Sequence, residues 1–466
     1  MSLFLIVKRG RRVISSSEIR VRAAHFGFDV GRSERNCRMR KKTVRAKSWK
    51  IWPPEYKPEE KMKVAFPNDG SFAFEFVRNL GFMYYGGSDL GEMIATAGLI
   101  KEGDEESWFT EWDKLGRRVL SRADASLAAG HLVSAREAYL RASTYFRTAE
   151  FYLHGNPGDP RILSTSRASQ KAYAEAARLT GPTWEPVQIP YEGTTLPGYF
   201  YKVDNSGKPR PTLIFFGGYD SSVEELFYMG AAGAVRRGYN CLTFDGPGQG
   251  APLREQKLPF RYDWEKVVTP AVDYVLTRPD VDGDNLALQG MSLGGFWCAR
   301  AVAFEHRFRA AVFYDGVYDF YQAIRGLVPK EAIAALDAGD SVTFEEIVYK
   351  LMQNNTALRW LVTNGVWTFG VSSFIDFVTK TKQYTMEGIA GQIQCPCLVL
   401  QGDADMFFLG QPQQIYDALQ VPKKIVRFGV EDGGENHCQS GELSYKDQVV
   451  FDWLDETLKL HDGRKG

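Results

Sequence analysis

Hydrophobic positions between residues 106 and 179 recur with the period of an α-helix. One series, with spacings of four, three and four residues, consists of Trp108, Trp112, Leu115 and Val119. A longer apolar stripe, with spacings of three and four, runs over residues 132–153, and a third helical pattern covers residues 166–179. Such spacings place side chains on one face of a helix. We therefore expect residues 62–182 to form a helical cap domain, in which the stripes serve mainly to pack the helices together.

After residue 183 the pattern changes to short apolar runs that alternate with helical stretches. Strands are expected at 187–191 and 198–202, joined by a turn at 194–197, and then at 211–216, 240–244, 285–289, 310–314, 397–401 and 424–428. Alternation of buried strands with helices is typical of an α/β fold with a mostly parallel, doubly wound sheet. In such a sheet, ligands bind beyond the carboxyl ends of the strands. Residues 183–466 are thus predicted to form the domain that holds the functional site.

One segment interrupts this alternation. Residues 321–394 are helical in pattern and separate two core strands by about 80 residues. A strand–helix–strand crossover needs only about a dozen residues. We interpret the segment as an inserted helical lid. The alternative is a packed helical excursion that takes no part in the function.

The turn at residues 290–295 reads Gly-Met-Ser-Leu-Gly-Gly and stands between an expected strand and an expected helix at 296–306. A strand, a Gly-x-Ser-x-Gly turn and a helix form a nucleophile elbow. The glycines leave room where side chains would collide with the flanking elements, and the strained turn exposes the Ser292 hydroxyl. The alternative is a glycine-rich turn with an incidental serine.

An acid and a histidine follow Ser292 in the chain. Asp405 lies just beyond one expected strand, and His437 lies on the polar loop after the next strand. A serine hydroxyl becomes a good nucleophile when an imidazole takes its proton and a carboxylate holds the imidazole tautomer. Serine, aspartate and histidine in this order are typical of one hydrolase fold. We predict that Asp405 orients His437, because Asp403 is better placed to stabilise its own turn.

Several motifs together resemble one branch of the α/β hydrolases. They are Phe-Gly-Gly-Tyr-Asp-Ser-Ser-x-Glu-Glu at 216–225, Phe-Asp-Gly-Pro-Gly-Gln-Gly at 244–250, the turn at 290–295 and Ala-Tyr-Leu-Arg-Ala-Ser-x-Tyr at 138–145. The sequence looks like the branch that includes 2,6-dihydroxypseudooxynicotine hydrolase and the fungal polyketide-shortening hydrolases. This branch is related to the FrsA-like esterases and to the catalytic domains of prolyl-oligopeptidase-type peptidases. The resemblance covers about residues 64–460.

The resemblance implies an α/β-hydrolase catalytic domain over residues 183–466. It implies a catalytic triad of Ser292, Asp405 and His437. It also implies an oxyanion hole formed by the backbone N–H groups of Tyr219 and Leu293.

The activity that the resemblance implies is hydrolysis, and three functions are considered. Family members with the best-known chemistry hydrolyse a carbon–carbon bond next to a carbonyl, so the first is a serine hydrolase of an aromatic or polyketide-like ketone. The second is a carboxylic-ester hydrolase or acyltransferase that uses the same site. The third is a non-catalytic binding protein with a hydrolase fold. The sequence leaves open whether Ser292 attacks the carbonyl or positions a water molecule.

Two acids that follow the expected strand at 310–314 are candidates for substrate binding. Asp315 and Asp319 flank Tyr318, and at least one of them is expected at the rim of the site. A carboxylate there would accept hydrogen bonds from phenolic hydroxyls and repel an anionic substrate. The alternative is that Asp319 caps the helix that follows it.

Charge is balanced overall but unevenly distributed. The chain has 57 Lys+Arg and 57 Asp+Glu, yet residues 1–50 hold 15 basic and 3 acidic side chains, a net charge of +12. The remainder therefore carries −12, so we expect no nucleic-acid partner. We expect residues 1–61 to be a disordered or non-native segment and Met62 to be a candidate start of the folded body. An organelle-targeting segment is the alternative.

Six cysteines are too few and too scattered for a disulfide framework, and no Cys/His cluster has the spacing of a zinc site. We therefore expect no metal, no other cofactor and a reducing, cytoplasmic location. No apolar run approaches the length of a membrane-spanning helix. The expected partner is a small-molecule substrate, and a homodimer stays open.

Overall fold

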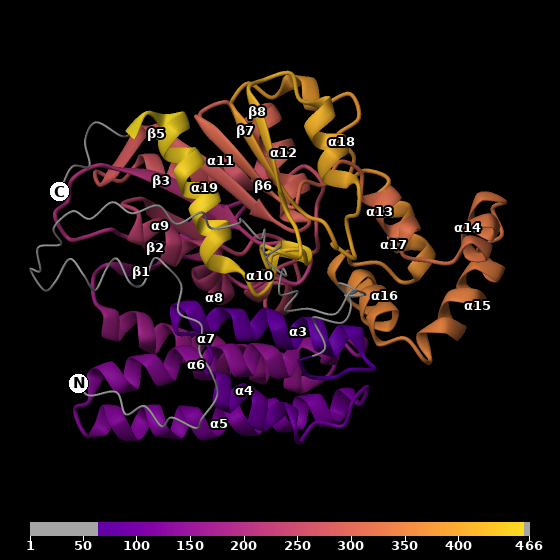
Figure 1. Ribbon diagram of the computed structural model, residues 1–466, viewed down its shortest axis with the longest axis horizontal. Coiled ribbons are helices and arrows are strands. Elements are labelled where there is room, and N and C mark those ends of the chain that lie inside the picture. The colour runs from indigo at the N-terminus through magenta and orange to yellow at the C-terminus, as the bar shows by residue number, and fades with distance from the viewer. Residues whose placement is uncertain (1–63, 461–466) are drawn as a thin grey trace, which may run out of the picture. The chain divides into compact units, whose positions relative to one another are not determined.

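The structure is a computed structural model that describes residues 64–460. The expectations for residues 1–61 and for Met62 lie outside the described residues. Figure 1 shows the described chain, with its N-terminal helices gathered on one side of the strands.

The N-terminal part of the described chain is helical, as the apolar stripes predicted. Its elements are α3 (Gly70–Gly81), η1 (Phe82–Tyr85), α4 (Leu90–Ala97), α5 (Glu105–Ala128), α6 (Leu132–Glu150), η2 (Phe151–Gly155) and α7 (Pro160–Thr180). Helix α6 packs against both α5 and α7. The α5 stripe faces this packing, because Trp108 and Trp112 are fully buried and Trp108 Nε1 donates to Thr148 O at 2.7 Å.

Eight strands form one sheet. They are β1 (Trp184–Tyr191), β2 (Thr194–Tyr201), β3 (Arg210–Phe216), β4 (Asn240–Phe244), β5 (Val281–Met291), β6 (Ala310–Tyr314), β7 (Cys397–Gly402) and β8 (Lys423–Phe428). Their order is β1-β2-β4-β3-β5-β6-β7-β8. Strand β2 pairs antiparallel with β1 and β4, and all other pairs are parallel. The expected mostly parallel sheet is therefore confirmed.

The first hairpin differs from the expectation. The turn expected at residues 194–197 is wrong, because β2 already begins at Thr194. The chain turns instead at Glu192 and Gly193, whose φ values of +39° and +84° suit a two-residue hairpin. Pro197 is tolerated inside β2 because pairing with β4 begins only one residue later.

Strand β8 also differs from the expectation of a buried strand. It lies at the edge of the sheet and pairs only with β7. Most of its side chains are partly or fully exposed, and Phe428 is the buried exception. An edge strand has a neighbouring strand on one side only. The apolar pattern therefore predicted more burial of the β8 side chains than the structure shows.

Helices connect the strands and pack on the sheet. They are α8 (Val223–Leu226), the π-helical turn η3 (Phe227–Ala231), α9 (Ala232–Arg236), α10 (Gly250–Arg254), α11 (Glu265–Leu276), α12 (Gly294–Phe304), α18 (Gln411–Ala418), η5 (His437–Gln439) and α19 (Leu443–Leu458). Helix α12 contacts α11, β5 and β6, while α19 contacts β6. A Cβ at Gly233 in α9 would collide with the Asp447 carboxylate of α19, so these two helices also lie side by side. In Figure 1, α19 lies in front of the strands and α12 lies behind them.

The segment between β6 and β7 is helical, as its pattern predicted. It contains α13 (Phe320–Gly326), α14 (Lys330–Asp337), α15 (Ser341–Met352), α16 (Thr356–Thr368), α17 (Phe374–Thr381) and η4 (Ala390–Gln392). Helix α16 contacts α3 and η2, so it meets the N-terminal helices, while α14 and α15 project outward at the right of Figure 1. Among residues 64–460, no helix combines the length and the hydropathy needed to cross a membrane.

Candidate active site

The turn at residues 290–295 has the backbone of a nucleophile elbow. Ser292 has a φ of +61°, in the left-handed region that non-glycine residues rarely adopt. Its N–H donates to Tyr314 O at 2.8 Å and so fastens the turn to the end of β6. A Cβ at Gly290 would lie only 2.0 Å from Gly294 O, so the close approach of turn and helix requires glycine there. The elbow holds Ser292 at the carboxyl end of β5.

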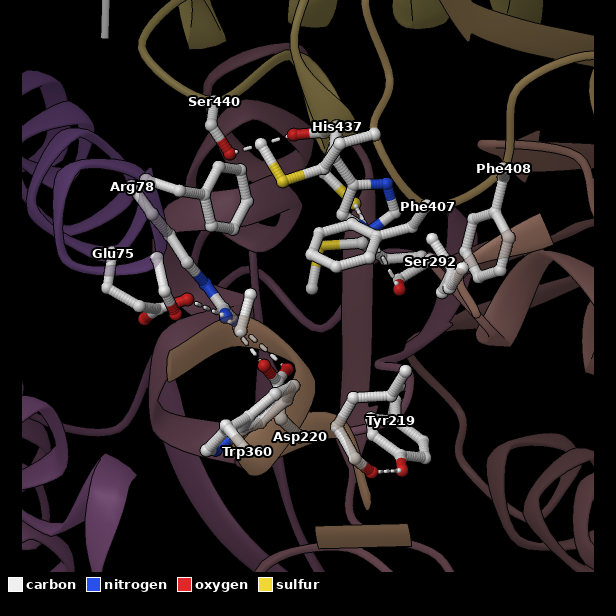
Figure 2. A pocket seen from close by; sticks show the side chains of 18 of the residues that line it. Glu75, Arg78, Tyr219, Asp220, Ser292, Trp360, Phe407, Phe408, His437 and Ser440 are labelled. Atoms are coloured by element: carbon white, nitrogen blue, oxygen red, sulfur yellow. Dashed lines mark hydrogen bonds and ion pairs between the residues drawn. The ribbon is translucent and has the colours of Figure 1, made fainter. Parts of the chain in front are cut away.

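Three side chains from the ends of β5, β7 and β8 meet beyond the sheet. Figure 2 shows two of them, Ser292 and His437. His437 Nε2 lies 2.9 Å from Ser292 Oγ, and His437 Nδ1 lies 2.8 Å from Asp405 Oδ2. The other Asp405 oxygen accepts the N–H groups of Phe407 and Phe408 at 2.7 and 3.1 Å. With Nδ1–H donated to the carboxylate, Nε2 is free to accept the serine proton.

Asp405 and Asp403 lie on the same loop but have different surroundings. Asp405 is 3% exposed and contacts His437, whereas Asp403 is exposed. The Asp403 N–H donates to Phe428 O at 3.0 Å, which links the loops after β7 and β8. Of the two acids, Asp405 is thus the one within reach of the imidazole.

The loop after β3 lies against the elbow. A Cβ at Gly218 would lie 2.7 Å from Ser292 Cβ and 2.9 Å from Leu293 N. The next residue on this loop is Tyr219. In turns and loops of residues 64–460, neither the Tyr219 N–H nor the Leu293 N–H donates a hydrogen bond. The Leu293 N–H is thus adjacent to Ser292, and the Tyr219 N–H lies one residue beyond the glycine that packs on Ser292.

Gln249 holds this loop in place, and sequence reasoning gave it no role. Its Nε2 donates to Gly217 O at 2.8 Å and to Gly218 O at 3.0 Å, and its Oε1 accepts the Gly246 N–H at 2.9 Å. The side chain is 2% exposed. Gln249 belongs to the motif at 244–250, which pointed to the family, but a linear motif does not reveal which backbone groups it holds.

Ser292 and His437 line a cavity that encloses about 860 Å³ of space, part of it open to solvent. The wall is mainly apolar and includes seven aromatic side chains from the N-terminal part and the later segments: Phe74, Phe151, Tyr219, Phe320, Trp360, Phe407 and Phe408. The cavity therefore suits an apolar substrate with flat parts.

A buried group of charges, here called the Arg78 network, contributes the polar part of the wall. It consists of the buried Glu75, Arg78, Arg147 and Glu225 and the partly buried Asp220. Glu75, Arg78 and Asp220 line the cavity. Arg78 donates to both Asp220 oxygens at 2.9 and 3.0 Å and to both Glu225 oxygens at 2.8 and 2.9 Å. Glu75 accepts from Arg78 at 3.1 Å and from Arg147 at 3.2 Å.

The acids of the Arg78 network differ in pKa. Burial raises the pKa of Glu75 more than Arg78 and Arg147 lower it. Burial would also raise the pKa of Asp220, but Arg78 outweighs it and lowers the pKa to about 2. Arg78 and Asp220 are 142 residues apart in the chain, so no local pattern could have indicated this group.

The acids expected at the rim of the site lie elsewhere. Neither Asp315, Tyr318 nor Asp319 lines the cavity. Asp315 is fully buried on the Nδ1 side of His437, with its Oδ2 3.0 Å from that nitrogen. Asp319 caps α13 by accepting the Gln322 N–H at 2.8 Å, which is the alternative considered from the sequence. The expectation that these residues bind substrate is corrected accordingly.

His437 is a buried base with carboxylates beside it. Burial lowers the pKa of His437, but the neighbouring Asp405 and Asp315 carboxylates raise it well above the ordinary value. Cys438 also lines the cavity, with its Sγ 3.3 Å from His437 Nε2. Burial raises the pKa of this thiol above its usual range, so the thiol stays protonated at neutral pH.

Comparison with known proteins shows that this chain is similar to hydrolases. The family described as Esterase FrsA-like matches residues 100–319. Hydrolase LUC6 of a Fusarium species is 39% identical over 409 residues, which cover 84% of this chain and 97% of that protein. The 20-hydroxy-prefusarin hydrolase FUS2 of Gibberella moniliformis is 36% identical over 408 residues, with coverage of 84% and 97%.

A solved structure supports the same fold. The 2,6-dihydroxy-pseudo-oxynicotine hydrolase has a TM-score of 0.66 and 22% identity, and covers 82% of this chain and 97% of its own. At this identity the likeness concerns the fold, which is the expected α/β-hydrolase fold. The chain is therefore a hydrolase with the α/β-hydrolase fold, and it belongs to the family of fungal hydrolases that includes LUC6 and FUS2.

Proposed function

We propose that the protein is a serine hydrolase that cleaves a carbon–carbon bond next to a carbonyl in an aromatic or polyketide-like ketone. Ser292 is the nucleophile, His437 the base and Asp405 the acid that orients His437. The observation that carries this assignment is the continuous line of contacts from Ser292 Oγ through the imidazole to Asp405, at 2.9 and 2.8 Å, on the wall of a mostly apolar cavity.

The chemistry begins with proton transfer from Ser292 Oγ to His437 Nε2 while Oγ attacks the ketone carbon. The carbonyl oxygen becomes an oxyanion and accepts hydrogen bonds from the N–H groups of Tyr219 and Leu293. When the carbonyl re-forms, the adjacent carbon–carbon bond breaks and its electron pair leaves with the departing carbon. Protonated His437 returns a proton to that carbon. Water, deprotonated by His437, then attacks the acyl-enzyme. His437 returns this proton to Ser292 Oγ as the ester bond breaks, which releases a carboxylic acid and restores the serine.

The leaving carbon must bear a stabilised negative charge for this step to proceed. A 1,3-diketone or a polyhydroxyaryl ketone meets this requirement, since the charge spreads over a second carbonyl or a ring. Two features of the cavity support such a substrate. Its aromatic wall suits flat rings, and the Glu75 carboxyl and Asp220 carboxylate can bond hydroxyl groups. The relative FUS2 is named for a hydroxylated compound, 20-hydroxy-prefusarin.

A second candidate is hydrolysis of a carboxylic ester, or acyl transfer, at the same site. The match of residues 100–319 to the FrsA-like esterases favours it. The same nucleophile, base and oxyanion donors serve an ester, whose alkoxide leaving group also takes its proton from His437. The two reactions therefore differ in the bond that breaks and not in the residues that act.

Two experiments test the proposal. Mass spectrometry of products from a panel of 1,3-diketones, acyl-phenols and simple esters identifies the bond that is cleaved. Ser292→Ala should lower kcat by roughly 10⁴-fold or more and leave folding intact. Ser71→Ala is a matched control, because Ser71 also lines the cavity but bonds Tyr152 Oη at 2.8 Å. Near-normal turnover by Ser292→Ala would refute the assignment, and trapping of an acyl group on Ser292 would separate covalent attack from water positioning.

A further inference from the structure

The imidazole of His437 faces two carboxylates at the same nitrogen. Asp405 Oδ2 lies 2.8 Å and Asp315 Oδ2 lies 3.0 Å from Nδ1. The two acids come from different loops, since Asp315 directly follows β6 and Asp405 lies beyond β7. A serine–histidine site needs only one carboxylate at this position. A second, fully buried one requires a reason, because burying a charge is costly.

Strained backbone surrounds the contact between Asp315 and the His437 loop. Asp315 Oδ2 accepts the Cys438 N–H at 2.5 Å, and Oδ1 accepts from Gln439 Nε2 at 3.3 Å. Asp315, Cys438 and Gln439 have φ values of +62°, +52° and +43°, all in the region that favours glycine. Strain of this kind persists only where the surroundings enforce it, and it clusters at active sites. Three such residues meet at this one carboxylate.

Asp315 is also joined to the elbow that carries the nucleophile. A Cβ at Gly295 would lie 2.2 Å from Asp315 O, so the backbone of the elbow packs directly on this residue. The Ser292 N–H donates to the preceding Tyr314 O at 2.8 Å. One short segment therefore contacts Ser292 through its backbone and His437 through its side chain.

We propose that Asp315 is a second positioning carboxylate for His437, which shares the Nδ1–H with Asp405 and sustains part of the activity when Asp405 is neutralised. The proposal rests on the proposed roles of Ser292 and His437. Either carboxylate can hold the tautomer that leaves Nε2 free, and both stabilise the imidazolium that forms when Nε2 takes the serine proton. The proton moves only between Oγ, Nε2 and the leaving group.

The charged groups around His437 make a pH profile a suitable readout. Besides the two aspartates, the ring faces the neutral Cys438 thiol of its own loop and, from the loop after β3, Asp220, which Arg78 neutralises. Removing the Asp315 charge takes away one source of stabilisation for the imidazolium. The acid limb of the activity profile should therefore move to lower pH in Asp315→Asn, whereas a purely structural role would leave it in place.

The experiment compares the wild-type protein with Asp315→Asn, Asp405→Asn and the double variant. Asp403→Asn is the matched control, since this exposed acid shares the Asp405 loop without contacting His437. The main readout is the rate at which a fluorophosphonate labels Ser292, because it reports activation of the serine whatever the substrate is. Thermal unfolding and the low-field proton resonance of Nδ1–H are recorded for each variant.

Asp405→Asn should label about 10- to 100-fold more slowly than wild type, in place of the roughly 10⁴-fold loss seen where a single carboxylate supports the histidine. Asp315→Asn should lose about 10-fold, and the double variant should reach the 10⁴-fold loss. Asp403→Asn should label like wild type.

Two results would overturn the proposal: wild-type labelling and an unchanged pH profile in Asp315→Asn, or a loss in Asp405→Asn as large as in the double variant. If Asp315→Asn fails to fold, the labelling rate and the Nδ1–H resonance of Asp405→Asn serve as the test. A labelling rate about 10⁴-fold below wild type, with no Nδ1–H resonance, would then count against Asp315. Failure of the proposed function looks different, because wild-type protein would then not label, or Ser292→Ala would label equally.

Discussion

Removing the Arg78 guanidinium should destabilise the protein more than most single substitutions. The side chain is 8% exposed and donates to three carboxylates, those of Glu75, Asp220 and Glu225. Arg78→Met keeps an unbranched chain of similar size but leaves Arg147 as the remaining cation of the network. Breaking a buried ion pair by removing one partner costs about 3–5 kcal/mol. The contacts share one guanidinium, so we expect this loss once and not a sum over the pairs.

The destabilisation caused by Arg78→Met should depend on pH. Arg78 lowers the pKa of Asp220 to about 2, against an ordinary value of 3.8. A depressed acid stabilises the fold fully above its unfolded pKa and loses this contribution as pH falls through its folded pKa. The wild type therefore holds the Asp220 contribution at pH 7 and loses it between about pH 4 and 2. The deficit of Arg78→Met should be largest at neutral pH and should shrink below about pH 4.

Urea unfolding followed by tryptophan fluorescence, at neutral pH and below about pH 4, measures the loss in the free energy of unfolding. Arg78→Lys keeps the charge without the two-pronged geometry, so it should recover only part of the loss. Arg117→Met is a surface control, because the Arg117–Asp113 pair is 67% exposed at the arginine and should be worth less than about 1 kcal/mol. A deficit below about 1 kcal/mol in Arg78→Met, or an equal deficit at both pH values, would refute the reasoning.

Three further predictions concern the site. Asp405→Asn should slow turnover at least 10-fold while Asp403→Asn stays near wild type, and steady-state kinetics showing the reverse order would contradict the assignment of the acid. Gly218→Ala should lower kcat by about 10²–10³-fold, because its Cβ would lie 2.7 Å from Ser292 Cβ and displace the proposed oxyanion donors. Unchanged kcat with normal folding would count against this. The kcat/KM profile should rise with pH through a value above 6.5, since the pKa of His437 is raised and only the neutral ring accepts a proton.

The sequence identified the fold and the three residues proposed for catalysis because each of them follows a strand. Parallel strands bring their carboxyl ends to one edge, so Ser292, Asp405 and His437 were expected to meet there although 145 residues separate the first from the last. The apolar stripes predicted the helices, because a helix that is buried on one face has apolar residues at spacings of three and four. Both inferences depend on local pattern combined with a general rule of topology.

What the sequence did not reveal depends on contacts without a local signal. Asp315 was expected at the substrate side, because a residue's place after a strand does not tell which side of the histidine it takes. Arg78 and Asp220 meet only through the packing of α3 on the loop after β3. The hairpin turn was misplaced because Pro197 is a strong turn signal, whereas the backbone turned at Gly193.

The position of Tyr219 has a consequence for how this enzyme could acquire new substrates. Its side-chain hydroxyl donates to Leu361 O at 2.6 Å, and Asn364 Nδ2 donates to its backbone oxygen at 3.2 Å, both on α16. The helix that shapes the cavity thus also fixes the residue whose N–H is proposed to stabilise the transition state. Helix α16 therefore affects both the choice of substrate and the rate of the reaction. Exchanging α16 between relatives should alter the turnover of every substrate as well as the preference among substrates. Recombination at this helix would therefore not change substrate preference alone.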